Sequence, residues 1–358
     1  MLKTLRNAWK VKEIRTKLIF TFLMLVVIRF GSELPIPGVK TDFFANFFAN
    51  QSTDAFGFFN AMTGGSFSSL SIFALSITPY ITSSIIMQLL TIAIPKLEEM
   101  QRDGEDGRKK IAEYTRYLTV GLALFESCAM AVGLGGKGLL LEDHRNIWGY
   151  LTVVAAMTAG SALLMWIGER ITDNGVGNGI SIILLCNIVS RMPSDLYNLS
   201  QKFMEGKQIS NVIIAGVIIF IVIIGTIILT IILNDAERRI PVQYSRKIQG
   251  GSQLGGLGST LPVKVNTANV MPIIFSSSLL QFPLVIKQLI GADPKGAAGF
   301  IFNALNQSNW CNPDHWNWSI GLIVYLLLNV VFAYFYTSIT FNPLEISNNM
   351  KKQGGYIP

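Results

Sequence analysis

The chain has 358 residues, of which 50% are hydrophobic and only 14% are charged. This composition is too apolar for a typical soluble domain and is typical of a polytopic helical membrane protein. The formal net charge of +7 would suggest nucleic-acid binding in a soluble protein. Here the basic residues lie mainly in short loops, so the charge indicates membrane topology first, and contact with anionic lipid or ribosomal RNA second.

The hydrophobic segments of the chain differ in polarity. Residues 211–233 contain no charged side chain and are long enough to cross a hydrocarbon layer about 30 Å thick. The other segments carry Ser, Thr, Asn, Gly and Pro, which indicates that they face a neighbouring helix or a water-filled cavity. In chain order we predict about eight spans, at residues 18–34, 70–93, 115–134, 148–167, 179–197, 211–233, 267–290 and 319–341.

The segments between the predicted spans are unequal in Lys and Arg. The N-terminal segment, the loops 95–114 and 234–266, and the C-terminal tail are rich in these residues, and they alternate along the chain. The positive-inside rule therefore places them, with the N-terminus, in the cytoplasm. The long, basic loop 234–266 contains many Gly and Ser residues, and it predicts a flexible docking surface or, equally, a plain connector.

Residues that carry chemistry are scarce within the predicted spans. The two histidines, His144 and His315, fall in predicted extracytoplasmic loops, which disfavours an intramembrane enzyme and a zinc site. We expect no cofactor and no metal. Glu126 and Arg29 are the clearest charges inside spans, and for both a structural role is favoured over an ion relay. An ion-coupled secondary transporter is the main alternative, but it needs buried carboxylates or a relay, and the sparse charge inside the spans argues against it.

A series of short motifs runs through the whole chain in a fixed order. They are PIPG at 35–38, SIFALSITPYI at 71–81, GRKK at 107–110, YTRY at 114–117, MWIGERIT at 165–172, GVGNGISI at 175–182, LPVKVN at 261–266, FNP at 341–343 and KKQGGYIP at 351–358. Their order and spacing resemble the bacterial SecY family, the channel subunits of the general protein-export translocon. The resemblance implies a protein-conducting channel of the plasma membrane that catalyses no covalent reaction.

The resemblance also implies an architecture. Members of the family have ten transmembrane helices in two pseudosymmetric halves that form an all-α clamshell. In this chain the N-terminal half corresponds to residues 1–197, with spans one to five, and the C-terminal half to residues 198–358, with spans six to eight. The last two helices of the family are missing from the sequence, so we expect a truncated or partial chain. A non-functional truncated homologue is therefore a further alternative.

Matching the family motifs predicts two elements that close the pore, a ring and a plug. A ring of aliphatic side chains at mid-membrane corresponds to Ile77, Ile81, Ile180, Leu184 and Ile274, for which ordinary core packing is the alternative interpretation. A short plug segment closes the outer funnel at rest. It lies within residues 56–69, a segment too short to cross the membrane, and its members are Asn60, Met62, Gly64, Gly65 and Ser66.

The same matching predicts a lateral gate and a docking surface. The gate residues are polar side chains on spans two and seven, for which ordinary interhelical hydrogen bonding is the alternative: Thr82, Ser83, Gln88, Ser276, Ser277 and Gln281. The docking residues are cytoplasmic cations: Arg238, Arg239, Arg246, Lys247, Lys351 and Lys352. The partners that the resemblance implies are the small membrane subunits SecE and SecG, the SecA motor, the ribosome, secretory preproteins and anionic lipids, with no small-molecule substrate.

Overall fold

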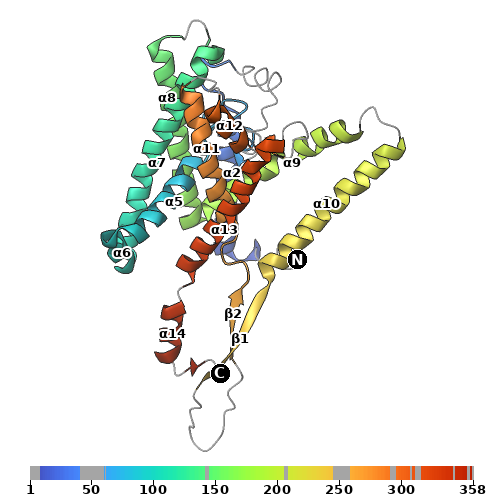
Figure 1. Ribbon diagram of the computed structural model, residues 1–358. Helices are drawn as coiled ribbons and strands as arrows, with labels where there is room; N and C mark the ends of the chain where they lie inside the picture. The colour runs from blue at the N-terminus through green and yellow to red at the C-terminus, as the bar shows by residue number, and fades with distance from the viewer. Residues whose placement is uncertain are drawn as a thin grey trace, which may run out of the picture. The chain divides into compact units, whose positions relative to one another are not determined.

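A computed structural model of the protein describes residues 9–40, 60, 62–141, 145–204, 209–244, 259–290, 296–306, 309–310, 316–341, 343–352 and 355–356. Most of these residues are helical (Figure 1). Contacts along the chain define two compact units, the first made of Met1–Tyr197 with Ser278–Ile323 and the second of Asn198–Ser277 with Val324–Pro358. The two predicted pseudosymmetric halves stay a prediction.

Each predicted span contains a helix. Among the described residues, four helices are long and apolar enough to cross a membrane, and a fifth is added if Thr78–Ala93 and Pro95–Gln101, which are bent by 107°, form one span. The helices are α2 (Lys12–Glu33), α5 (Thr78–Ala93), α6 (Pro95–Arg102), α7 (Glu105–Leu134), the π-helical η2 (Gly135–Leu139), α8 (Ile147–Asn174), α9 (Gly179–Met204), α10 (Ile209–Asp235), α11 (Met271–Ile290), α12 (Ala297–Leu305), the 3₁₀ turn η5 (Trp316–Ser319), α13 (Ile320–Thr340) and α14 (Pro343–Lys352).

The second span begins later than the sequence predicts. The helix α5 starts at Thr78 instead of residue 70, and the residues before it form turns around a β-bridge between Pro35 and Ser71. Leu70 and Ser76 have φ values of 47° and 52°, which are incompatible with a right-handed helix. The run is apolar because it is buried, and a short buried run cannot be distinguished from a helix by its hydrophobic pattern.

The first unit is built around this buried turn. The helix α7 packs against α8 and α5, and α2 packs against α8. At Gly160 on α8, an added Cβ atom would lie only 2.0 Å from the carbonyl oxygen of Ile72, so glycine is required for the turn to approach the helix. The core cluster of this unit comprises Ile36, Val39, Phe67, Leu70, Ala74, Leu75, Ala123, Met130, Ala131, Leu139, Leu140, Val153 and Met157.

The second unit contains a small antiparallel sheet that the sequence analysis did not predict. The strands β1 (Glu237–Tyr244) and β2 (Ser259–Lys264) form a hairpin from the long basic loop, and β3 (Gly355–Tyr356) pairs with the other edge of β1 in the order β2-β1-β3 (Figure 1). Alternation in β1 places Val242 on a buried face, at 3% exposure. The ends of the expected flexible loop are therefore ordered strands, and residues 245–258 lie outside the described part.

Candidate functional site

Two of the predicted ring residues lie one turn apart at the start of α5. Ile77 is the N-cap residue of the helix and is fully buried, and Ile81 is 7% exposed. The Ile81 amide donates a hydrogen bond of 3.1 Å to the Ile77 carbonyl oxygen, so both residues lie on one face. The structure thus places the pair together and buries both, while their membership of a ring stays a prediction.

Two further ring residues lie on α9, where Ile180 and Leu184 are both half-buried. The Cγ1 atom of Ile180 lies 3.2 Å from the position that a Cβ atom on Gly168 would take, so Ile180 packs closely against α8. The neighbouring Ile183 is fully buried. Ile180 therefore lies on the face of α9 that packs against α8, and Leu184 follows one turn later on the same helix.

The fifth predicted ring residue, Ile274, belongs to the second unit. It is half-buried near the start of α11. The next residue, Phe275, is 3% exposed and packs edge-on against the rings of Phe332 and Tyr336 on α13, at centroid distances of 5.6 and 6.2 Å. These contacts anchor the first turns of α11 to α13. The convergence of all five ring residues stays a prediction.

In the described part of the predicted plug, Asn60 and Met62 are helical and a tight turn follows from Thr63. Gly64 and Gly65 have φ values of 67° and 91°, a conformation that side-chain-bearing residues rarely adopt. The Gly65 amide and the Ser68 amide donate to the main-chain and side-chain oxygens of Asn60, at 3.0 and 3.1 Å. The turn is followed by Phe67, which is 2% exposed in the core cluster. Residues 56–59 and 61 lie outside the described part.

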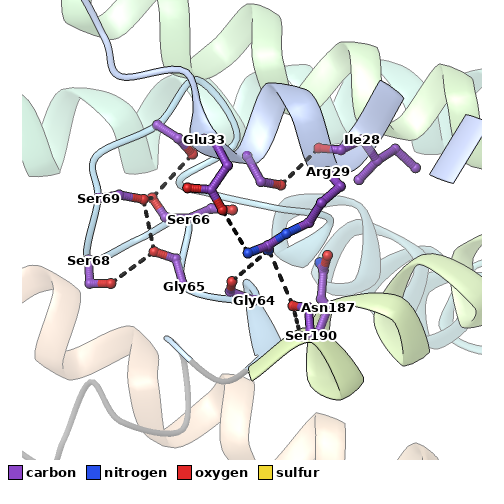
Figure 2. A network of polar contacts seen from close by, with 12 residues as sticks. Ile28, Arg29, Glu33, Gly64, Gly65, Ser66, Ser68, Ser69, Asn187 and Ser190 are labelled. Carbon is purple, nitrogen blue, oxygen red and sulfur yellow. Dashed lines mark hydrogen bonds and ion pairs between the residues drawn. The ribbon is translucent and has the colours of Figure 1, made fainter. Parts of the chain in front are cut away.

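The plug turn is joined to α2 by a guanidinium group (Figure 2). Arg29 Nη1 donates to the Gly64 carbonyl oxygen at 3.0 Å and to the Ser190 hydroxyl on α9 at 3.2 Å. Arg29 Nη2 forms an ion pair of 2.7 Å with Glu33 one turn later on α2. The sequence analysis assigned Arg29 a structural role but did not predict its partners. The structure shows that it connects three separate segments of the chain.

A second polar side chain, on α9, contacts the same turn. Asn187 is 4% exposed, and its Nδ2 atom donates to the Met62 carbonyl oxygen at 3.3 Å and to the Ser76 hydroxyl at 3.2 Å. Sequence reasoning missed this residue. The available signal was an amide inside an apolar span, since such a group requires a hydrogen-bonding partner at that depth. The residues next to Asn187 in the sequence do not indicate which segment supplies that partner.

Most hydroxyl groups of the predicted gate are bonded within their own helices. Thr82 on α5 donates to the carbonyl oxygen four residues earlier at 3.1 Å, and Ser83 does so at 2.7 Å. Ser277 on α11 donates in the same way at 2.7 Å. These bonds satisfy the hydroxyl groups without a partner helix. Bonds within one helix do not distinguish a gate from ordinary packing, so the gate assignment stays a prediction.

The remaining gate residues differ from one another in their surroundings. Ser276 is fully buried, and its hydroxyl has no hydrogen-bond partner among the described residues. Gln88 is exposed near the end of α5. Gln281 lies on α11, but its side chain is outside the described part of the chain.

The predicted docking cations that the structure describes are exposed. Arg238 and Arg239 lie on β1, and Lys351 and Lys352 end the helix α14. Pairing of Gln243 with Tyr356 attaches the segment after α14 to the same sheet as the hairpin. The two basic segments thus belong to one structural unit. Arg246 and Lys247 lie outside the described residues.

The structure offers little for metal or acid–base chemistry in the part of the chain that it describes. No group of three or more His, Cys, Asp or Glu side chains that could hold a metal ion occurs there. Glu126 is half-buried on α7. Glu169 on α8 forms an ion pair of 2.7 Å with Arg116 on α7.

Comparison with known proteins identifies the family. The family model for SecY matches residues 71–358. The chain belongs to the SecY family. The protein translocase subunit SecY of Halalkalibacterium halodurans is 40% identical over 361 residues, which cover 100% of this chain and 81% of that protein. The corresponding subunit of Thermotoga maritima is 37% identical over 370 residues, which cover 100% and 80%.

Solved structures show the same fold. A protein-conducting channel aligns with a TM-score of 0.63 and 17% sequence identity, covering 96% of this chain and 77% of that one. Sec61 in the canine ribosome–channel complex of the endoplasmic reticulum aligns with a TM-score of 0.60 and 18% identity, covering 96% and 76%. The all-α, polytopic membrane fold predicted from the sequence is thereby confirmed.

Family membership also settles the class of function. The chain is a protein-conducting channel subunit, and it is a multi-pass protein of the bacterial plasma membrane. The predicted resemblance is confirmed, as is the expectation that the protein is not an enzyme. An ion-coupled transporter and an intramembrane enzyme are accordingly disfavoured.

Proposed function

We propose that this channel subunit passes unfolded chains through a constriction lined by the predicted ring, and releases apolar helices sideways into lipid. Apolar side chains at a narrow constriction disfavour a continuous column of water and ions, and they are soft enough to fit around a peptide. Four ring members are Ile77 and Ile81 on α5 and Ile180 and Leu184 on α9. Ile274 on α11 is the fifth.

One residue carries the proposal. Asn187 follows Leu184 by three residues on α9 and donates to Met62 in the plug and to Ser76, which precedes Ile77. A single side chain therefore bonds the proposed plug to both segments that bear ring residues in the first unit. Core packing accounts for buried isoleucines, but it does not require a left-handed glycine turn bonded to the same helix.

The proposed plug is the segment at residues 60–66, which leaves its place when a chain enters. Phe67 marks the fixed end of this segment, because it is buried in the core cluster and its removal would cost about 3–5 kcal/mol. Opening therefore breaks the polar contacts of the turn and leaves the core intact. The trigger we propose is an apolar signal helix that enters at the gate, where the polar side chains of α5 and α11 meet water.

The proposed partners follow from exposed charge. Arg238 and Arg239 on the hairpin and Lys351 and Lys352 on α14 suit the phosphates of ribosomal RNA or an acidic surface of the SecA motor. We place these residues and the N-terminus in the cytoplasm, and anionic lipids there complement the same charges. The small subunits SecE and SecG complete the translocase, which SecA or the ribosome drives. Secretory preproteins are the cargo.

Site-specific crosslinking tests the proposal. A photoreactive residue replaces Ile81 in the assembled translocase, and a secretory precursor is stalled in transit. The matched control replaces Leu229 on α10, which is 61% exposed. We expect a crosslink to the precursor from position 81 and none from position 229. Equal crosslinking at both positions, or none at position 81, would contradict the ring. Rescue of a translocon-depleted strain by this chain would exclude a non-functional homologue.

A further inference from the structure

The contacts of Arg29 are arranged to hold the plug turn from one side. Its guanidinium reaches the Gly64 carbonyl oxygen at 3.0 Å, the Ser190 hydroxyl at 3.2 Å and the Glu33 carboxylate at 2.7 Å. Figure 2 shows the group between α2, the plug turn and α9. A planar guanidinium has five donors in a fixed arrangement, which suits three acceptors that lie in different directions. The guanidinium is thus the common point of the three segments.

The turn is shaped so that this contact can form. Gly64 has a φ of 67°, and a Cβ atom there would lie 3.0 Å from the Cα atom of Asn187. The backbone of the turn therefore rests directly on the backbone of α9. This seating presents the Gly64 carbonyl group to Arg29, and the bond is made to the main chain instead of a side chain.

A second bond holds the turn from the side of α9. Asn187 donates to the carbonyl oxygen of Met62 at 3.3 Å, two residues before the carbonyl group held by Arg29. The two bonds flank Thr63, which is 1% exposed. Two carbonyl groups of one short turn are thus bound by two different helices. Withdrawal of the turn must break both bonds in one movement.

We propose that Arg29 is a positioning residue that latches the plug closed, with Asn187 as the second point of attachment. This inference rests on the proposed plug. A hydrogen bond from a charged donor favours the bonded state by roughly tenfold or more. The latch therefore sets how often the resting channel opens without a substrate. It acts on the resting seal and leaves the passage of a chain through the open ring unaffected.

Accessibility of the turn measures the latch. Ser66 is 1% exposed, so a Ser66→Cys substitution reports opening through its reaction with a membrane-impermeant maleimide in the reconstituted translocase. We expect Arg29→Met to raise the labelling rate by roughly tenfold or more and to raise the resting ion conductance with it. The matched control is Arg170→Met, the same change at an exposed guanidinium that lies over the Trp166 ring on α8. It should leave both rates unchanged.

Two further variants separate the possible failures. If deletion of residues 60–66 leaves the resting conductance unchanged, the proposed plug is wrong and the latch falls with it. If that deletion raises conductance while Arg29→Met changes neither readout, only the latch is wrong. Should Arg29→Met fail to assemble, Arg29→Gln keeps a polar group but is too short to reach Gly64. Labelling at the parent rate in this variant would overturn the latch as well.

Discussion

The membrane helices α9 and α10 use their polar residues in opposite ways. In α10, Thr226 and Thr230 each donate to the carbonyl oxygen four residues earlier in the same helix, at 2.7 Å. In α9, Asn187 donates to two other segments, and Ser190 accepts a bond from Arg29 on α2. Both helices are apolar enough to cross a membrane. Of these four polar residues, the two on α9 therefore join separate segments of the chain, whereas the two on α10 bond within their own helix.

The helices α9 and α10 also differ in how closely other residues pack against them. Among the described residues of the two spans, none in the most apolar part of α10 is buried, whereas 17% in that of α9 are. A Cβ atom added at Gly225 in α10 would meet no atom within 4 Å, whereas one added at Gly168 on α8 would lie 3.2 Å from Ile180 Cγ1 on α9. Among the described residues, close packing therefore constrains α9 at Ile180 and leaves space at Gly225 of α10. Identical substitutions in the two regions should therefore have different effects.

The largest difference is expected for valine at two glycine positions. Gly64→Val introduces a branched side chain at a left-handed position that lies against the α9 backbone, at a cost of about 3 kcal/mol. Labelling of Ser66→Cys should then rise by about a hundredfold. Gly225→Val enters open space and should leave the labelling rate unchanged. Similar effects of the two changes would remove the contrast between the regions.

A smaller difference is expected for loss of a polar group from each helix. Asn187→Ala removes two hydrogen bonds and should lower the free energy of unfolding by about 2 kcal/mol. Thr226→Val removes a hydroxyl group bonded within its own helix, so the change should stay within about 0.5 kcal/mol. Thermal unfolding of the purified protein in detergent measures both. A loss at Thr226 as large as that at Asn187 would contradict the comparison.

The smallest effect is expected at the solvent edge of the plug network. The side chains of Glu33 and Arg29 are 64% and 41% exposed. Water and salt therefore screen the ion pair between them. Glu33→Gln should raise labelling of Ser66→Cys by less than about fivefold, and high salt should reduce the difference. An effect equal to that of Arg29→Met would show that the ion pair, and not the bond to Gly64, holds the turn.

Sequence reasoning located the spans well, because the hydrophobic length needed to cross lipid is a local property. It was wrong where an apolar segment is buried inside the protein, because such a segment has the same hydrophobic pattern as one buried in lipid. The run SIFALSI at 71–77 was assigned to a span, but it forms buried turns next to α2 and α8. The β1–β2 hairpin was missed for a related reason, since its two strands are separated by a Gly-rich and Ser-rich segment that reads as a connector.

The sequence by itself determined the family, the membrane class and the number of apolar segments, because motif order and hydrophobic length are carried along the chain. Only the tertiary structure decided which polar groups meet. Arg29 and Gly64 are 35 residues apart, and Asn187 and Met62 are 125 residues apart. A buried amide or guanidinium in a span must find a partner, but the partner is set by how the helices pack. The plug contacts therefore emerge only when α2, α9 and the glycine turn are brought together.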